Sequence, residues 1–134
     1  MKAITKTLTL ALVAIFVSIS AFANVKVDKT TEKARQAVNS ASPDDWHTYA
    51  ISAEKCIKKN VNLKEASEWI KKSVEIKETS YNLKVLGDYY AKNKLPQKAV
   101  EAYSKSIRLG KMEDSNYTDK ATQDKIVKLV KQLG

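Results

Sequence analysis

The chain has 134 residues, and its 24 lysine and arginine residues against 15 aspartate and glutamate residues give a net charge of +9 at pH 7. Cys56 is the only cysteine and His47 the only histidine, which excludes an intramolecular disulfide framework and a metal site built on pairs of these ligands. A positive charge of this size favours acidic partners or anionic surfaces.

The N-terminus, residues 1–23, has the pattern of a secretory signal peptide. Two lysines precede a mostly apolar stretch at 8–20, and a small-residue pattern at 21–23 places cleavage before Asn24. The apolar stretch is short for a membrane span, which favours cleavage over the alternative of a retained anchor. We therefore expect an exported protein, either periplasmic or secreted.

The mature chain that this cleavage predicts, residues 24–134, has the length of one domain. Removal of the two lysines of the signal peptide lowers the net charge from +9 to +7. We do not expect nucleic acid as a partner, because export is predicted and the lysines are scattered rather than gathered in one block. Cys56 lies between Ala53 and Ile57 on an apolar helix face, so a buried thiol is favoured over a reactive or dimer-forming one.

Apolar residues recur at helical spacing along almost the whole mature chain. The first predicted helix covers Thr30–Val38, and the segment Asn39–Pro43 interrupts the pattern. Ser42 is the predicted N-cap of the second helix, with Pro43 in its first position, and this helix should end near Lys59.

A second helix pair is predicted from the next stretch of sequence. A turn at Asn60–Asn62 leads into a helix at Leu63–Lys77. Ser80 is the predicted N-cap of the following helix, whose apolar pattern covers Asn82–Lys92, and a turn at 93–95 ends it.

Pro96 should open the next helix, and Gly110 should end it as a left-handed C-cap. A polar linker at Met112–Tyr117 follows, and either Ser115 or Thr118 is the predicted cap of the last helix. That helix should close the open end of the stack with its apolar stripe, which consists of Ala121, Ile126, Val127, Leu129, Val130 and Leu133.

Two segments of the chain resemble each other and form an internal repeat. The stretch Asn60–Ile76 aligns without a gap on the stretch Asn93–Leu109. A repeat of this length indicates stacked helical hairpins, each too small to bury its own apolar face alone. The sequence therefore predicts an all-α protein of about six helices: an N-terminal helix, two hairpins and a C-terminal capping helix.

The second copy of this repeat resembles the tetratricopeptide repeat. The residues that carry the resemblance are Leu83, Leu86, Gly87, Tyr90, Ala99, Tyr103 and Ser106. Ser106 stands where that family usually has alanine, and the first copy has Ala53-Glu54 in place of Leu-Gly. The resemblance covers about 46–111 and implies a small exported bacterial protein of tetratricopeptide-like fold, in which small residues lie where the two helices of a hairpin approach each other.

No residue pattern for catalysis is present. His47 beside Trp46 is typical of a partly exposed packing residue, and the carboxylates of Glu65, Glu68 and Glu75 are spaced as on a solvated helix face. The chain has no glycine-rich phosphate loop and no serine nucleophile motif. We therefore expect no enzyme activity, no cofactor and no metal.

The resemblance implies a concave groove lined by the first helix of each hairpin. By alignment with the family, the groove-facing side chains would include Lys55, Lys58, Lys59, Tyr81, Lys84, Asp88 and Lys92, together with Thr48, Ile51 and Ala91. Some family members clamp a carboxylate with a lysine and an asparagine; Lys84 matches that lysine, but Asp88 replaces the asparagine. A solvated lysine face without a ligand is the alternative interpretation.

The function expected from these features is non-catalytic protein–protein interaction, as a scaffold or adaptor that binds an acidic segment in a lysine-lined groove. One alternative is an accessory or inhibitory module of an exported enzyme. Another is a basic protein held on anionic surfaces of the cell envelope. Self-association through the open ends of a short repeat array is also considered.

Overall fold

The computed structural model describes residues 26–134, and the predicted signal peptide, residues 1–23, lies outside them. Over this described range the protein is all-α, as predicted, with no strand. Its helices are α1 (Lys29–Ser40), α2 (Trp46–Lys59), α3 (Leu63–Ile76), α4 (Ser80–Lys92), α5 (Pro96–Glu113) and α6 (Lys120–Leu133). Within residues 26–134, no helix combines the length and apolar character that crossing a membrane requires.

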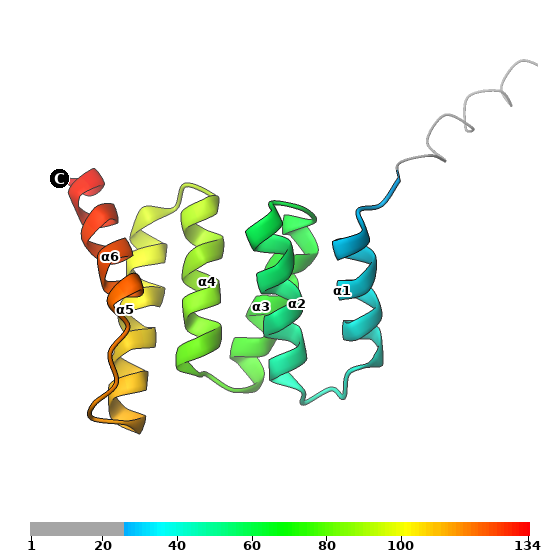
Figure 1. Cartoon of the computed structure of the whole chain (residues 1–134), viewed down its shortest axis with the longest axis horizontal. Coiled ribbons are helices and arrows are strands. Elements are labelled where there is room, and N and C mark those ends of the chain that lie inside the picture. Colours follow the sequence, from blue (N-terminus) through cyan, green and yellow to red (C-terminus); the bar gives the residue numbers. More distant parts are fainter. Residues whose placement is uncertain (1–25) are drawn as a thin grey trace, which may run out of the picture.

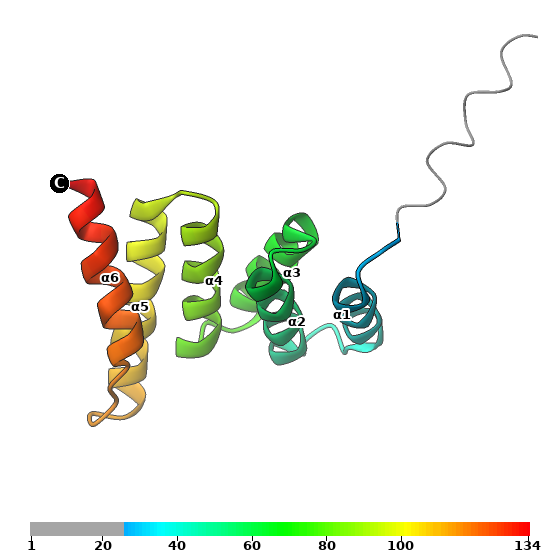
Figure 2. The ribbon, with the colours of Figure 1, turned by 45° about the horizontal axis from the view of Figure 1, so that its top comes forward.

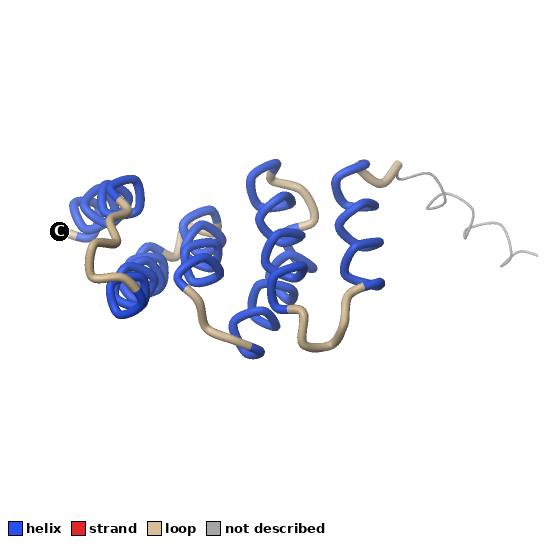
Figure 3. The backbone as a smooth tube through the Cα atoms, turned by 60° about the horizontal axis from the view of Figure 1, so that its bottom comes forward, coloured by secondary structure: helices blue, strands red, loops and turns tan. Residues whose placement is uncertain are grey.

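The helices stand in a row, with α1 at one end and α6 at the other (Figures 1 and 2). Successive helices run in opposite directions, so α2/α3 and α4/α5 form two antiparallel hairpins, and α2, α4 and α6 run the same way (Figure 1). The connections between helices are short (Figure 3). This arrangement puts α2, α4 and α6 in position to line a common surface.

Each of the three parallel helices begins with a side-chain cap. Asp45 accepts from the Thr48 amide at 3.0 Å, Asp119 accepts from the Thr122 amide at 2.9 Å, and Thr79 forms a reciprocal capping box with Asn82. These contacts satisfy backbone amides that no helical carbonyl can reach.

The caps predicted from the sequence lie a few residues away from the observed ones. Ser42 and Pro43 are in a turn before α2 rather than at its start, since the Asp45 amide bonds back to the Ser42 carbonyl at 3.0 Å. Ser80 is the first helical residue of α4, because Thr79 reaches the amide of the third residue. Neither Ser115 nor Thr118 caps α6, where the carboxylate of Asp119 does so.

Gly110 is not a left-handed C-cap, contrary to the prediction. It lies within α5, which continues to Glu113. Tyr117 folds back over it, and a Cβ at this position would lie 2.5 Å from the Tyr117 ring. The glycine is therefore required for close approach of a side chain rather than for a positive φ.

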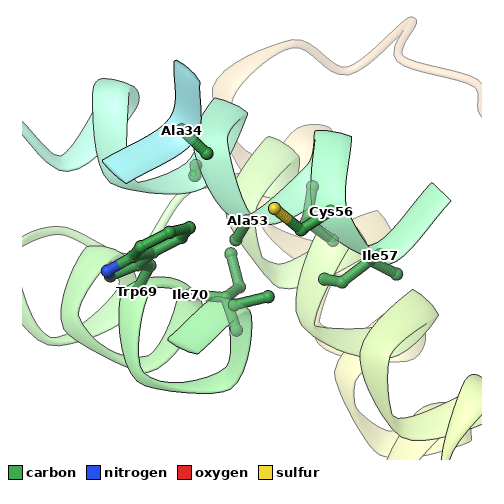
Figure 4. Close-up of a cluster of buried hydrophobic side chains, with 9 residues drawn as sticks. Ala34, Ala53, Cys56, Ile57, Trp69 and Ile70 are labelled. Atoms are coloured by element: carbon green, nitrogen blue, oxygen red, sulfur yellow. The ribbon is translucent and has the colours of Figure 1, made fainter. Parts of the chain in front are cut away.

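The core at the α1 end of the row is a cluster of buried apolar side chains from four helices, to which α4 contributes Val85. Ala34 of α1, Ala53 and Cys56 of α2, and Trp69 and Ile70 of α3 meet there (Figure 4). Cys56 is completely buried, as predicted, and this burial raises the pKa of its thiol.

The core of the second hairpin is built on a glycine and a tyrosine. Tyr103 of α5 is 1% exposed, and its ring lies against Gly87 of α4 so closely that an added Cβ would be 2.4 Å from two ring carbons. The predicted close approach of the two helices at Gly87 is thus confirmed.

A serine ties the two helices of each hairpin together. Ser73 of α3 donates to the Trp46 carbonyl at the start of α2, and Ser106 of α5 donates to the Ser80 carbonyl at the start of α4, both at 2.6 Å. The two serines occupy equivalent positions in the two aligned segments and are completely buried, so the repeat in sequence is also a repeat of one hydrogen bond. A buried hydroxyl without such a partner would be destabilising.

Gly87→Ala should destabilise the protein. The added methyl group would collide with the buried Tyr103 ring, and the resulting strain should exceed the gain in helix propensity, for a net loss of about 1–2 kcal/mol in the free energy of unfolding. Urea unfolding followed by circular dichroism measures this. Gly110→Ala should cost less, because the half-buried Tyr117 ring can move towards solvent.

Gly134→Ala is the matched control, since the nearest atom to its added Cβ is the Val130 carbonyl oxygen at 4.0 Å. An unfolding midpoint of Gly87→Ala equal to that of this control would contradict the account of the α4/α5 contact.

Candidate binding groove

A hollow of about 590 Å³ opens where the C-terminal halves of α2, α4 and α6 come together. Its floor and walls are formed by Ile57, Lys58, Asp88, Ala91, Lys92, Tyr103, Lys125, Lys128, Leu129 and Gln132. We call this hollow the central groove. It combines an apolar floor with a rim of four lysines and one aspartate.

Two of the four rim lysines already have an acidic partner within the chain. Lys58 pairs with Glu54 at 2.8 Å, and Lys125 pairs with Asp88 at 2.6 Å. Lys92 and Lys128 form no ion pair with any other residue of the 26–134 range. These two ammonium groups are available for an anionic group that enters the groove.

Asp88 is a structural residue of the groove. Its Oδ1 accepts a hydrogen bond from the Tyr103 hydroxyl at 2.6 Å and the contact from Lys125 at the same distance, and the Lys125 ammonium lies 5.4 Å from the centre of the Tyr103 ring. Burial and the hydrogen bond to Asp88 raise the pKa of Tyr103 well above its usual value. One carboxylate thus joins α4, α5 and α6.

Tyr81 and Lys84 lie on α4, like Asp88, but they line a different hollow, of about 420 Å³, near the start of this helix. The Tyr81 hydroxyl donates to Glu54 at 2.8 Å, and Lys84 lies 3.6 Å from Asp119. Burial would raise the pKa of Glu54, but the hydrogen bonds from Lys58 and Tyr81 outweigh it, so the pKa is lowered overall. Both predicted groove residues are therefore engaged in contacts within the protein.

Lys55 and Lys59 line a third hollow, of about 540 Å³, between α1 and α2. Lys29, Lys33 and Lys58 complete its set of charged side chains, and no acidic side chain lines it. The structure therefore divides the seven predicted residues among three hollows. Only Lys58, Asp88 and Lys92 belong to the central groove.

The contribution of α6 to the central groove was not predicted from the sequence. Lys125, Lys128, Leu129 and Gln132 recur at intervals of three or four and so share one face of the helix. This spacing is visible in the sequence, but the apolar stripe of the same helix was interpreted only as a cap. That prediction is wrong for much of the stripe, because Val127, Val130 and Leu133 remain exposed. His47 is exposed and packs edge-on against the Trp46 ring, with ring centres 5.3 Å apart.

The chemistry that these hollows offer is recognition of negative charge beside apolar surface. Within the part of the chain that the structure describes, no group of three histidine, cysteine or acidic side chains is arranged to hold a metal ion. Comparisons with protein-family models, with curated proteins and with solved structures found no match to this chain.

The stability of the protein should fall as the pH rises above about 10. Tyrosine in an unfolded chain loses its proton near this pH, whereas folded Tyr103 keeps its proton to higher pH. Above this pH the unfolded state binds fewer protons than the folded state. The contribution of Tyr103 to the free energy of unfolding is therefore complete below about pH 10 and is lost progressively above it.

In Tyr103→Phe this decline should be shallower by up to about 1.4 kcal/mol per pH unit, the value for one proton. Asp88 keeps its contact with Lys125 in this variant, so the carboxylate is not left alone. Urea unfolding at a series of pH values between about 9 and about 11.5 measures the two slopes. Equal slopes would show that Tyr103 does not retain its proton in the folded state.

Proposed function

We propose that this chain is an exported, non-catalytic protein of tetratricopeptide-like architecture that binds an acidic segment of a partner protein in the central groove. The observation that carries the proposal is the pair of lysines without acidic partners, Lys92 on α4 and Lys128 on α6, at the rim of a hollow with an apolar floor in the described part of the chain. An acidic peptide offers both the carboxylates and the apolar side chains that such a hollow can accept.

The tetratricopeptide-like assignment is supported by the arrangement of the helices. Two antiparallel hairpins follow one another, the segments 60–76 and 93–109 align without a gap, and the close contact between Gly87 and Tyr103 lies at the spacing of that family's pattern. In such arrays the first helix of each hairpin lines the concave surface, which corresponds here to α2, α4 and α6.

The mode of binding we propose differs from a carboxylate clamp at Lys84 and Asp88. Asp88 is held by Tyr103 and Lys125, and Lys84 lies beside Asp119. The acidic segment would instead be read by side chains nearer the C-terminal ends of the three helices.

A second candidate function is association with an anionic envelope surface. It is favoured by the hollow between α1 and α2, which is lined, among the described residues, by five lysines and no acidic side chain; of the five, Lys58 pairs with Glu54, which does not line the hollow. Binding of this kind depends on charge density rather than on groove shape, so it should be lost as salt screens the charges. The two candidates therefore differ in salt dependence and in the lysines that they require.

Lys92→Glu/Lys128→Glu should abolish capture of a groove partner, because it replaces both free ammonium groups with carboxylates. The exported protein would be immobilised and exposed to envelope extract of its source cell at about 0.05 M and about 0.3 M salt. We expect a defined protein that the unmodified chain retains at both salt concentrations and that this variant retains at least tenfold less.

Lys64→Glu/Lys71→Glu is the matched control, with the same change in charge on exposed α3 lysines that form no ion pair within residues 26–134. Equal loss in this control would point to net charge rather than to the groove. Capture that is lost only at the higher salt, and in Lys29→Glu/Lys33→Glu, would favour the envelope surface instead.

A further inference from the structure

Helix α6 has the position and register of the first helix of a third hairpin. Counted from the N-caps, the eighth residue is Ala53 in α2, Gly87 in α4 and Val127 in α6. Ala53 is fully buried in the core that α2 shares with α3, and Gly87 is covered by Tyr103 of α5. Val127 is 53% exposed.

The eleventh residue after each cap repeats this relation. Cys56 of α2 is completely buried and Tyr90 of α4 is partly buried, whereas Val130 of α6 is 49% exposed. In the described chain no helix follows α6. The apolar side chains that would contact the second helix of a hairpin are therefore present on α6, but no described helix covers them.

This exposed stripe lies on a different side of α6 from the central groove. At 100° per residue, Val127 and Val130 centre about 180° from the direction shared by Lys125, Lys128 and Gln132, which line the groove. Leu133, 41% exposed, extends the stripe towards the end of the helix. A terminal helix of a repeat array ordinarily presents a polar outer face, and this stripe departs from that rule.

We propose that the stripe is the contact between two copies of this chain, whose α6 helices pack antiparallel across a two-fold axis. Val127 of each copy would lie against Val130 of the partner subunit. The covering element would be an antiparallel helix, as α3 is for α2 and α5 is for α4 (Figure 1). Self-complementary patches of this kind are the rule for two-fold dimers.

The charges beside the stripe are complementary in this orientation. Asp124 and Lys131 flank the valines on the same side of α6, with Asp124 one turn before Val127 and Lys131 one turn after Val127. In an antiparallel pair, Asp124 of one copy lies near Lys131 of the partner subunit, and the contact occurs twice by symmetry. Asp124 also pairs with Lys120 at 2.9 Å, but both side chains are exposed and such pairs are weak and exchangeable.

The other side of the stripe is apolar and favours the same orientation. Ile126 and Leu133 lie there, and an antiparallel pair places Ile126 near Leu133 of the partner subunit. A parallel pair would instead bring this apolar flank against the charged flank of the partner. The antiparallel arrangement is thus the one that matches apolar with apolar surface and acid with base.

A charge swap tests the proposal. The exported protein, which contains all six described helices, would be studied by sedimentation equilibrium over concentrations up to about 1 mM. We expect a monomer–dimer equilibrium whose dissociation constant rises at least tenfold in Asp124→Lys and returns to within about threefold of the original value in Asp124→Lys/Lys131→Asp. Circular dichroism would show that α6 remains folded.

Val127→Ser/Val130→Ser should weaken the dimer at least tenfold, whereas Leu95→Ser/Met112→Ser, which removes exposed apolar side chains elsewhere, should leave it unchanged. A monomer at every concentration would overturn the proposal. So would a dimer that is insensitive to Asp124→Lys or is not restored by the swap. Lys92→Glu/Lys128→Glu should leave dimerisation intact, so this test is independent of partner capture by the groove.

Discussion

The contact between Tyr103 and Gly87 is the constraint on which the second half of the structure depends. The absence of a side chain on Gly87 lets the Tyr103 ring lie directly on α4. The Tyr103 hydroxyl then reaches the carboxylate of Asp88, the residue that follows Gly87. Lys125 binds the same carboxylate and lies over the same ring, which attaches α6. A single buried aromatic side chain therefore sets the distances among three helices, and a bulkier residue at Gly87 would disturb all of them.

The position of α6 also determines the character of the central groove. Without α6, the faces of α2 and α4 would present Lys58, Asp88 and Lys92 on an open surface. With it, Lys128 lies on the opposite wall from Lys58 and a hollow forms between them. Asp88, the one acidic residue among the described residues that line the groove, is paired with Lys125, so the remaining charge of the groove is positive. The fold thus converts scattered lysines into a local concentration of charge.

The helices and turns could be predicted from the sequence because apolar spacing, Pro96 and the asparagine-rich turn at 60–62 are local signals. The predicted helix caps differ by a few residues from the observed ones, because several neighbouring polar residues can each cap a helix and packing selects among them. Gly110 was misinterpreted because the side chain that needs it, Tyr117, follows in an irregular segment. The division of the predicted lysines among three hollows, and the part played by α6, depend on tertiary contacts that no local pattern specifies.

The serine hydrogen bonds give the molecule a modular character. Ser73 and Ser106 each donate a hydrogen bond to a carbonyl within their own hairpin, so the residues that join the two helices of a hairpin all belong to that hairpin. Ser73 also accepts from the Asn82 side chain at 3.0 Å, which adds a link to the following hairpin. Duplication or loss of one whole hairpin would therefore add or remove both the serine and the carbonyl of this hydrogen bond together. Gain or loss of a whole hairpin would leave the serine hydrogen bonds of the other hairpins intact, whereas contacts between hairpins, such as that of Asn82 with Ser73, would have to form anew.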